Sequence, residues 1–310
     1  MPHRKWMFPV TEAWVRACVR RVVRADGRRA SAVVSTSPFT PLDVSPAPTR
    51  VYYATDAYHA GADLLGRDPG WLRELERRRL IEATHVGAVS SVITDGWQVD
   101  RPTFVLPNGA NTRHYAGVDD APLPDDVPAQ GPVVGVVGHL SARIDLDVLE
   151  AVATRPLTLL LVGPRVEQWG GQRFEDLVQR PNVVWVGNKA YAELPSYLRV
   201  MDVGLTPYVT SAFNQASSPL KTLEYLAAGR AALSTPLPGV TALDTELVEC
   251  ASTPAAFADA AERLARRDRD GALVRARREL ASTHDWSSRA RQLLEIIGLP
   301  ARGEVTTGSR

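Results

Sequence analysis

A lysine and a glutamate three positions apart are the side chains best suited to hold a ligand. Residues 217–229 read SSPLKTLEYLAAG, and their charged members are Lys221 and Glu224. Lysine occurs elsewhere only at Lys5 and Lys189, so Lys221 is not one of many interchangeable surface cations. Side chains three apart share one face of a helix, and the positive end of the helix dipole lies at its beginning. The segment therefore predicts a site for an anionic ligand such as a diphosphate.

The ends of this helix are also indicated by the sequence. Ser218 is predicted to cap it, Pro219 to be its first helical residue, and Gly229 to end it in the left-handed conformation. Leu220 begins an apolar stripe at helical spacing. One alternative for Glu224 stays open, because its carboxylate could simply pair with Lys221 on the helix surface. Such exposed pairs contribute only about 0.3–0.5 kcal/mol.

A second group of candidates lies in the loop at residues 138–145, GHLSARID, between a predicted strand and a predicted helix. Gly138 and His139 would offer backbone N–H groups there, and Arg143 could add a bidentate contact to a phosphate. Glycine and arginine also occur in such loops for reasons of folding or solubility. Because the carboxyl ends of parallel strands meet at one edge of a sheet, we expect this loop and Lys221 to converge on one diphosphate. Glu224 would then accept hydrogen bonds from a ribose diol.

Four further residues stand near predicted strand ends. Gly163 and Gly187 lie where a nucleotide base or backbone could pack, although turn formation explains them equally well. Asp56 and His59 follow a strand in the first half of the chain and could position an acceptor hydroxyl. A structural Asx-turn and a surface histidine are equally open explanations for these two residues.

The composition is that of an ordinary globular protein, with 310 residues that are 45% hydrophobic and 23% charged. This length suffices for two domains, and a formal charge of +1 argues against a nucleic-acid partner. Cys18 and Cys250 lie far apart without metal-ligand spacing, so we expect no metal site. The sequence shows neither a long apolar run nor a signal peptide, which predicts a cytoplasmic protein. The arginine-rich first helix leaves open a peripheral contact with the inner face of the cell membrane.

Short β-rich apolar runs alternate with helical patterns, which is typical of α/β domains built on parallel sheets. We predict two Rossmann-like doubly wound domains that face a shared cleft. Strands are predicted at residues 32–35, 51–54, 86–89 and 104–106 in the first half, and at 133–137, 157–162, 183–186, 203–206 and 231–234 in the second. Helices are predicted at residues 12–24, 71–83, 146–153, 174–179, 194–200, 219–228 and 286–297.

A polar stretch rich in proline and aspartate separates the two halves. We predict a first domain at residues 1–117, a linker at 118–131 and a second domain at 132–283. A C-terminal helix at residues 284–302 could cross back to the first domain, and residues 303–310 would form a tail.

Several motifs in one order resemble the GT-B fold glycosyltransferases of the retaining group 1 class, family 4, and among them the teichuronic-acid-biosynthesis type. The resemblance covers most of the chain. The motifs are VYYATD at 51–56, LPNGAN at 106–111, GHLS at 138–141, LVGP at 161–164, YAELPSY at 191–197, DVGL at 202–205, and SPLK with EYLAAG in 218–229.

This resemblance implies transfer of a hexose, with retention, from a UDP- or GDP-sugar to an acceptor hydroxyl, without a metal or other cofactor. The acceptor would be a glycan, a lipid-linked sugar or a small molecule. Lys221 and a loop arginine such as Arg143 would hold the diphosphate, and Glu224 the ribose. The other residues expected around the donor are Gly138, His139, Gly163, Gly187, Ser218 and Leu220.

The chain departs from the family pattern in two ways. Ala216 stands where many members have a second glutamate, so the role of that carboxylate is not carried over, and backbone groups near residues 214–217 could serve instead. The chain also begins at a later helix than family members do, so the first domain is expected to be incomplete. Besides an active transferase, two hypotheses stay open: a catalytically weak nucleotide-sugar-binding or partner subunit, and, as a minor alternative, a GT-B sugar-phosphate epimerase.

Overall fold

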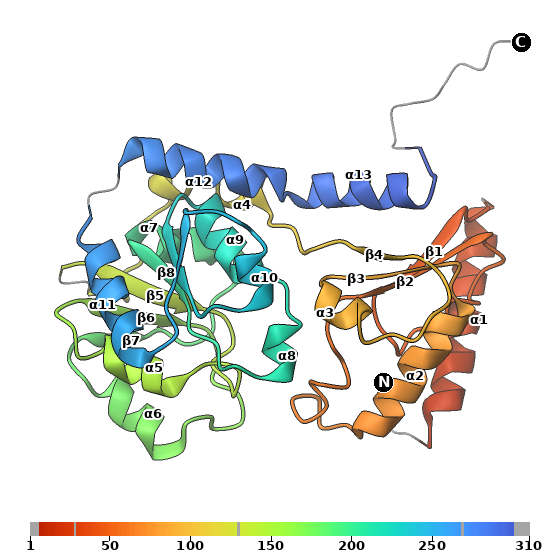
Figure 1. Ribbon diagram of the computed structural model, residues 1–310, viewed down its shortest axis with the longest axis horizontal. Helices are drawn as coiled ribbons and strands as arrows, with labels where there is room; N and C mark the ends of the chain where they lie inside the picture. Colours follow the sequence, from red (N-terminus) through yellow and green to blue (C-terminus); the bar gives the residue numbers. More distant parts are fainter. Residues whose placement is uncertain (1–5, 28, 129–130, 268–269, 301–310) are drawn as a thin grey trace, which may run out of the picture. The chain divides into compact units, whose positions relative to one another are not determined.

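The structure is a computed structural model that describes residues 6–27, 29–128, 131–267 and 270–300. The chain forms two compact units, each built on one sheet (Figure 1). The first unit comprises Met1–Asn108, Ala216–Ser218 and Arg289–Arg310, and the second comprises Gly109–Gln215 and Pro219–Ser288.

The first unit contains a parallel sheet of four strands in the order β1-β2-β3-β4. Its core is formed by the apolar side chains of the strands together with residues of the surrounding helices. The elements are α1 (Phe8–Asp26), β1 (Ala32–Ser35), β2 (Thr49–Ala54), α2 (Pro69–Glu82), β3 (His85–Ala88), α3 (Ser91–Thr94), β4 (Thr103–Val105) and most of α13 (Trp286–Ile296).

A buried arginine ties the two long helices of this unit together. Arg79 on α2 is 1% exposed and donates hydrogen bonds to Glu12 of α1 and to Glu82. The rings of Phe8 and Trp71 add an edge-to-face contact with centroids 5.4 Å apart. Because a buried guanidinium is stable only with anionic partners, Arg79 fixes α1 beside α2, as Figure 1 shows.

The second unit contains a parallel sheet of six strands in the order β10-β9-β8-β5-β6-β7. The strands are β5 (Val133–Val137), β6 (Thr158–Val162), β7 (Val183–Trp185), β8 (Val203–Thr206), β9 (Ala231–Ser234) and β10 (Val248–Cys250). The helices are α4 (Thr112–Tyr115), η1 (Val118–Asp120), α5 (Leu146–Val152), α6 (Gly171–Val178), η2 (Tyr191–Glu193), α7 (Leu194–Val200), α8 (Ala212–Gln215), α9 (Leu220–Ala227), α10 (Pro238–Thr241), α11 (Pro254–Ala265) and α12 (Gly271–Thr283).

Both faces of this second sheet are covered by helices. Val134 and Val136 of β5 pack into a core with α5, α6 and α11, whereas Val133 and Val137 pack into a core with α7 and α9. In Figure 1, α5 and α6 lie on one side of the sheet, and α9 and α12 lie on the other. Burial on both faces explains why these strands read as continuous apolar runs.

The predicted α/β class with two parallel sheets is confirmed. The strands at 32–35, 133–137, 203–206 and 231–234 have the predicted bounds, and the other predicted strands shift at either end by no more than two residues. Helix α1 begins at Phe8, four residues before the predicted start, because Pro9 fits the first turn of a helix. Strand β10 was not predicted, since its three residues include Glu249 and give no apolar run.

The structure divides the chain between Asn108 and Gly109 rather than in the predicted linker at 118–131. Tyr115 lies just before that stretch and Val118 lies within it, and both are fully buried in the core of the second unit. From Arg289 onward the last helix is grouped with the first unit. Linker residues 129–130, and residues 301–310 with the predicted tail, lie outside the described residues.

Two loops at the carboxyl edge of the second sheet approach so closely that a glycine is required. Gly138 follows β5 and Gly163 follows β6, with φ of 145° and 140°. A Cβ at Gly163 would lie 1.9 Å from the carbonyl oxygen of Gly138. The N–H of Gly138 donates to Val162 at 2.9 Å, and that of Gly163 to Gly187 at 2.8 Å. The loops after β5, β6 and β7 are thus one hydrogen-bonded layer.

This close approach predicts that Gly163→Ala lowers the free energy of unfolding by more than about 2 kcal/mol, because the new Cβ collides with backbone. Gly171→Ala is the matched control. Gly171 also has a positive φ, 51°, but an added Cβ there meets nothing within 4 Å, so we expect a loss of only about 1 kcal/mol. Urea unfolding measures both variants, and equal losses would contradict the close approach.

Candidate functional site

The strand order of the second sheet reverses between β5 and β8, which is where open α/β sheets bind ligands. The register between the two strands ends at the pair of Gly135 and Gly204. Beyond that pair, the hydroxyl of Tyr225 lies between the strands. It accepts a hydrogen bond from the N–H of Val137 at 3.0 Å and donates one to the carbonyl of Leu205 at 3.3 Å. A side chain from α9 therefore replaces the missing strand-to-strand bonding.

Tyr225 fixes the position of α9 on the sheet. Its ring lies against Gly204, where an added Cβ would come within 2.1 Å of the ring. The side chain is 1% exposed, and burial raises the pKa of its hydroxyl, so the hydroxyl stays protonated and can donate. Lys221 lies one turn earlier on the same helix face. The bridge thus brings Lys221 to the carboxyl edge of the sheet.

Lys221 lies at a helix beginning that has no side-chain cap. Pro219 is the N-cap of α9 and makes no capping hydrogen bond. The N–H groups of a first helical turn have no intrahelical partner. A Cβ at Gly138 would lie 3.8 Å from the Cε of Lys221, so the lysine side chain reaches the loop after β5. An ammonium group and the positive end of a helix therefore meet at the strand-order reversal.

The ion pair that the sequence left open as an alternative is present. Lys221 Nζ lies 2.7 Å from Glu224 Oε2, and the two side chains are 24% and 9% exposed. The pair is therefore largely buried, in contrast to the exposed pair considered from the sequence. In this part-buried setting the pairing matters more than on an open surface, because the Glu224 carboxylate has little access to water.

The capping role predicted for Ser218 is wrong. Helix α9 begins at Leu220, one residue later than predicted, and Leu220 itself is half-buried. The Ser218 hydroxyl instead accepts a hydrogen bond from the N–H of Asn108 at 2.9 Å. This partner lies 110 residues away in the sequence, so a local pattern could not reveal it.

Arg143 is held by side chains of the segment that follows β8. Its Nε donates to Oδ1 of Asn214 at 2.9 Å, and its guanidinium lies 5.1 Å and 4.8 Å from the ring centroids of Tyr208 and Phe213. Asn214 is fully buried and donates in return to the carbonyl of Arg143 at 3.0 Å. The loop after β5 is thereby fastened across the reversal.

The loop that carries Gly138 and His139 contributes fewer free donors than predicted. The N–H groups of Gly138 and Leu140 already donate to backbone carbonyls at 2.9 Å each. Helix α5 is capped by Asp145, whose carboxylate accepts from the N–H groups of residues 147 and 148 at 3.0 Å and 3.3 Å. The first N–H groups of α5 are therefore already partly satisfied by Asp145, and the convergence of this loop and Lys221 on one diphosphate stays a prediction. His139 is exposed on this loop.

The structure adds Tyr115, which sequence analysis missed. Tyr115 is 0% exposed, and among the described residues its hydroxyl makes no hydrogen bond of ordinary geometry, although Tyr191 lies near enough to contribute to its raised pKa. Burial, and after it the negative charge of Glu224, raises the pKa of this hydroxyl, so it remains a protonated donor. A buried polar group without a partner requires an explanation, and a ligand contact is one. Tyr115 follows the LPNGAN motif, but no spacing links it to Glu224.

Sequence analysis suggested that backbone groups near residues 214–217 could replace the glutamate that is absent at Ala216. One of these backbone groups is already hydrogen-bonded within the protein. Ala216 is 2% exposed, and its carbonyl accepts a hydrogen bond from the Ser90 hydroxyl at 2.6 Å. The side chain of Asn214 is used by Arg143 and by backbone carbonyls. These groups hold the segment before α9 in place.

Asp56 and His59 follow the carboxyl end of β2 in the first unit. The Thr55 hydroxyl donates to Asp56 at 3.4 Å. His59 Nδ1 lies 3.8 Å from a carboxylate oxygen of Glu76, whose other oxygen accepts from the Tyr52 hydroxyl at 3.1 Å. Glu76 is 6% exposed, so the structure adds a buried carboxylate to the predicted pair.

Within the described ranges, no group of three or more histidine, cysteine, aspartate or glutamate side chains is arranged to hold a metal ion. In that same part of the chain, every helix is too short or too polar to cross a membrane.

Replacing either of two buried tyrosines by phenylalanine is predicted to change stability by different amounts. Tyr225→Phe removes the bridge between β5 and β8 and leaves two backbone groups unpaired, so the free energy of unfolding should fall by about 1–3 kcal/mol. Tyr115→Phe removes a hydroxyl without a protein partner, so stability should change by less than about 0.5 kcal/mol or rise. Urea unfolding compares the two. Equal losses would contradict the assignment of the bridge.

Comparison with known proteins finds similarity over this region. Residues 131–267 match the family model of glycosyl transferases group 1, and this range contains the loop after β5 and helix α9. TuaH of Bacillus subtilis, provisionally named a teichuronic acid biosynthesis glycosyltransferase, is 34% identical over 176 residues. These residues are 55% of this chain and 44% of TuaH, so the chain matches less than half the length of this relative.

Solved structures show the same fold. Sucrose-phosphate synthase from Thermosynechococcus elongatus has a TM-score of 0.72 at 21% identity, covering 96% of this chain and 79% of that chain. HepE from Anabaena, solved with UDP and glucose, has a TM-score of 0.67 at 17% identity, covering 90% of this chain and 80% of that chain. The chain therefore has the GT-B type of fold, and its residues 131–267 match the group 1 glycosyltransferase model.

Proposed function

We propose that the chain is a glycosyltransferase that moves a hexose from a nucleotide diphosphate sugar to an acceptor hydroxyl. One observation carries the proposal: Lys221 lies at the uncapped beginning of α9 and against Gly138, where the strand order reverses. The family match over this region supports it. The complex of HepE with UDP and glucose supports a UDP-linked donor, and GDP stays an alternative base.

The diphosphate is the group that this arrangement suits best. Lys221 supplies an ammonium, the first turn of α9 supplies N–H groups, and Arg143 supplies a second cation across the reversal. In glycosyl transfer the diphosphate is the leaving group, so cations placed around it stabilise the negative charge that develops as it departs. Protein cations in this position make the reaction independent of a metal ion in our proposal.

Glu224 is the proposed ribose ligand. Its carboxylate is 9% exposed and now pairs with Lys221, and the charge of Glu224 raises the pKa of the nearby Tyr115 hydroxyl. When Lys221 turns to the diphosphate, Glu224 needs new donors, and a ribose diol provides two hydroxyl groups. The unpartnered hydroxyl of Tyr115 can donate to Glu224 or to the nucleotide at the same place.

The proposed reaction proceeds with retention at the anomeric carbon. The bond between that carbon and the diphosphate oxygen breaks, and the acceptor oxygen bonds to the carbon on the same face. The acceptor proton moves to the departing diphosphate oxygen, so no strong protein base is needed. Asp56 and His59 of the first unit are the proposed positioning groups for an acceptor that is a glycan, a lipid-linked sugar or a small molecule.

An alternative function is a nucleotide-sugar-binding subunit with little activity. The observation that favours it is Ala216, which is buried and offers no carboxylate where the resemblance leads us to expect one. Incubation of the full chain with UDP-glucose or GDP-mannose, with release of UDP or GDP as the readout, separates the two functions. Nucleotide release supports a transferase, and saturable binding without release supports the alternative.

The diphosphate assignment predicts a large effect of Lys221→Ala. The dissociation constant of UDP or GDP should rise about 10- to 150-fold, because a charge-assisted contact worth about 1.5–3 kcal/mol is lost. Lys189→Ala is the matched control, since Lys189 pairs with Asp126 at 2.6 Å. Isothermal titration calorimetry measures both. Unchanged nucleotide affinity in Lys221→Ala would refute the assignment.

The ribose assignment predicts a non-additive effect of Glu224→Gln. In the unmodified chain, replacing the nucleotide by its 2′,3′-dideoxy form should weaken binding about tenfold or more, because the carboxylate loses two donors. In Glu224→Gln the difference between the two nucleotides should shrink to about threefold or less. If Glu224 pairs only with Lys221, the penalty for the dideoxy form will be the same in both proteins.

A further inference from the structure

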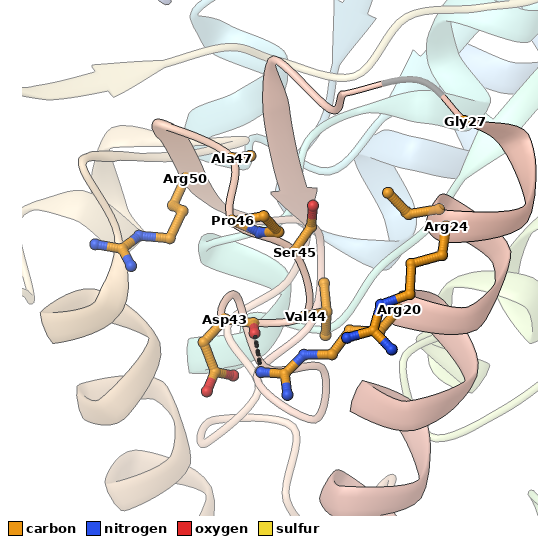
Figure 2. A pocket seen from close by; sticks show the side chains of 10 residues that line it. Arg20, Arg24, Gly27, Asp43, Val44, Ser45, Pro46, Ala47 and Arg50 are labelled. Carbon is orange, nitrogen blue, oxygen red and sulfur yellow. Dashed lines mark hydrogen bonds between the residues drawn. The ribbon is translucent and has the colours of Figure 1, made fainter.

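The first unit contains a cavity that the proposed function does not use. It has a volume of about 730 Å³ and is lined by the last turns of α1 and by residues 43–50 (Figure 2). Three arginines line it: Arg20 and Arg24 from α1, and Arg50 from β2. Small-molecule sites in proteins span roughly 300–1,000 Å³, so this cavity is large enough for an organic ligand.

In the described part of the chain, no acidic side chain pairs with the arginines of this cavity. Among the described residues, none of the three arginines forms an ion pair. Asp43 is the acidic residue of the lining, but its carboxylate pairs with Arg16 at 2.7 Å. Arg20 donates instead to the backbone carbonyl of Asp43 at 3.1 Å, which is the dashed line in Figure 2.

Two buried polar atoms in the lining have no partner in the described part of the chain. Ser45 is 7% exposed, and its hydroxyl makes no hydrogen bond there. In Figure 2, Ser45 lies on the loop between Arg50 and the arginines of α1. The Nε of Arg50 is also buried without a partner. Buried donors of this kind are normally satisfied, so both indicate a ligand that accepts hydrogen bonds.

A simpler explanation covers only part of these observations. Arg24 lies in the last turn of α1, where a cation complements the negative end of the helix dipole. That effect does not account for Arg50, which lies on a strand, or for the buried Ser45 hydroxyl. The presence of a strand arginine and a buried serine hydroxyl in the same lining needs a further cause.

We propose that this cavity binds a phosphate group carried by an organic molecule. Guanidinium groups bind phosphate through paired N–H donors, and a serine hydroxyl adds a third kind of donor. A bare phosphate would leave most of the cavity unfilled, and Val23, Val44 and Ala47 provide apolar lining for an attached organic group. A phosphorylated small molecule and a lipid headgroup share this chemistry.

The phosphate site is separate from the proposed acceptor groups. Arg50 lies near the amino end of β2, and Asp56 and His59 follow its carboxyl end. A strand rises about 3.3 Å per residue, so the four steps from Arg50 to Ala54, the last residue of β2, already span about 13 Å. Ligand binding at this cavity is therefore independent of the donor and acceptor roles proposed above.

The test is equilibrium binding of sn-glycerol 3-phosphate to the full chain, with Lys221→Ala as background so that the proposed donor site does not contribute. Arg24→Gln and Arg50→Gln should each weaken binding about tenfold or more, and Ser45→Ala about threefold or more. Arg21→Gln is the matched control, because Arg21 is exposed on the same helix and does not line the cavity. Its affinity should be unchanged. Melting temperatures establish that each variant folds.

A second experiment distinguishes a soluble phosphorylated ligand from a lipid headgroup. Vesicles of phosphatidylcholine with and without phosphatidylglycerol are floated with the same proteins. A lipid headgroup is supported as the ligand if vesicle binding requires phosphatidylglycerol, Arg24 and Arg50. Glycerol 3-phosphate should then not displace the protein from the vesicles. Saturable binding of glycerol 3-phosphate supports it with a soluble ligand. The proposal is overturned if neither probe binds, or if Arg21→Gln weakens binding as much as Arg24→Gln.

Discussion

The hydroxyl of Tyr225 is the interaction on which the second unit depends. Strands β5 and β8 separate where the strand order reverses, and this hydroxyl pairs the N–H of Val137 and the carbonyl of Leu205 that the separation leaves buried. The same side chain anchors α9, so the helix that satisfies the backbone also presents Lys221 and Glu224 at the sheet edge. Fold stability and the position of the candidate site are thus coupled through one residue.

Electrostatics at this site follow from its partial burial. Lys221 and Glu224 are held together at 2.7 Å with little access to water, and Arg143 is held by Asn214 and two aromatic rings. Charges placed in this way lose little freedom when a ligand arrives, because the protein already fixes them. In the proposed function, a nucleotide diphosphate exchanges the lysine–glutamate pair for two ligand contacts, so neither charge is left unpaired.

Sequence patterns predicted the parts of this arrangement that local physics determines. Continuous apolar runs located β5 and β8 to the residue, and the spacing of Lys221 and Glu224 predicted their pairing face. Tertiary partners could not be predicted in this way. The N–H of Asn108 donates to the Ser218 hydroxyl, and Arg143 donates to Asn214, which lies 71 residues away in the sequence. The cap on α5 was not predicted, although Asp145 directly precedes this helix.

A crystal structure of the full chain with UDP tests the central claim most directly, namely that Lys221 and the beginning of α9 form a diphosphate site. The account predicts diphosphate oxygens within about 2.7–3.2 Å of Lys221 Nζ and of N–H groups in the first turn of α9, with Glu224 turned to the ribose. A nucleotide bound elsewhere, with Lys221 still paired to Glu224, would contradict it.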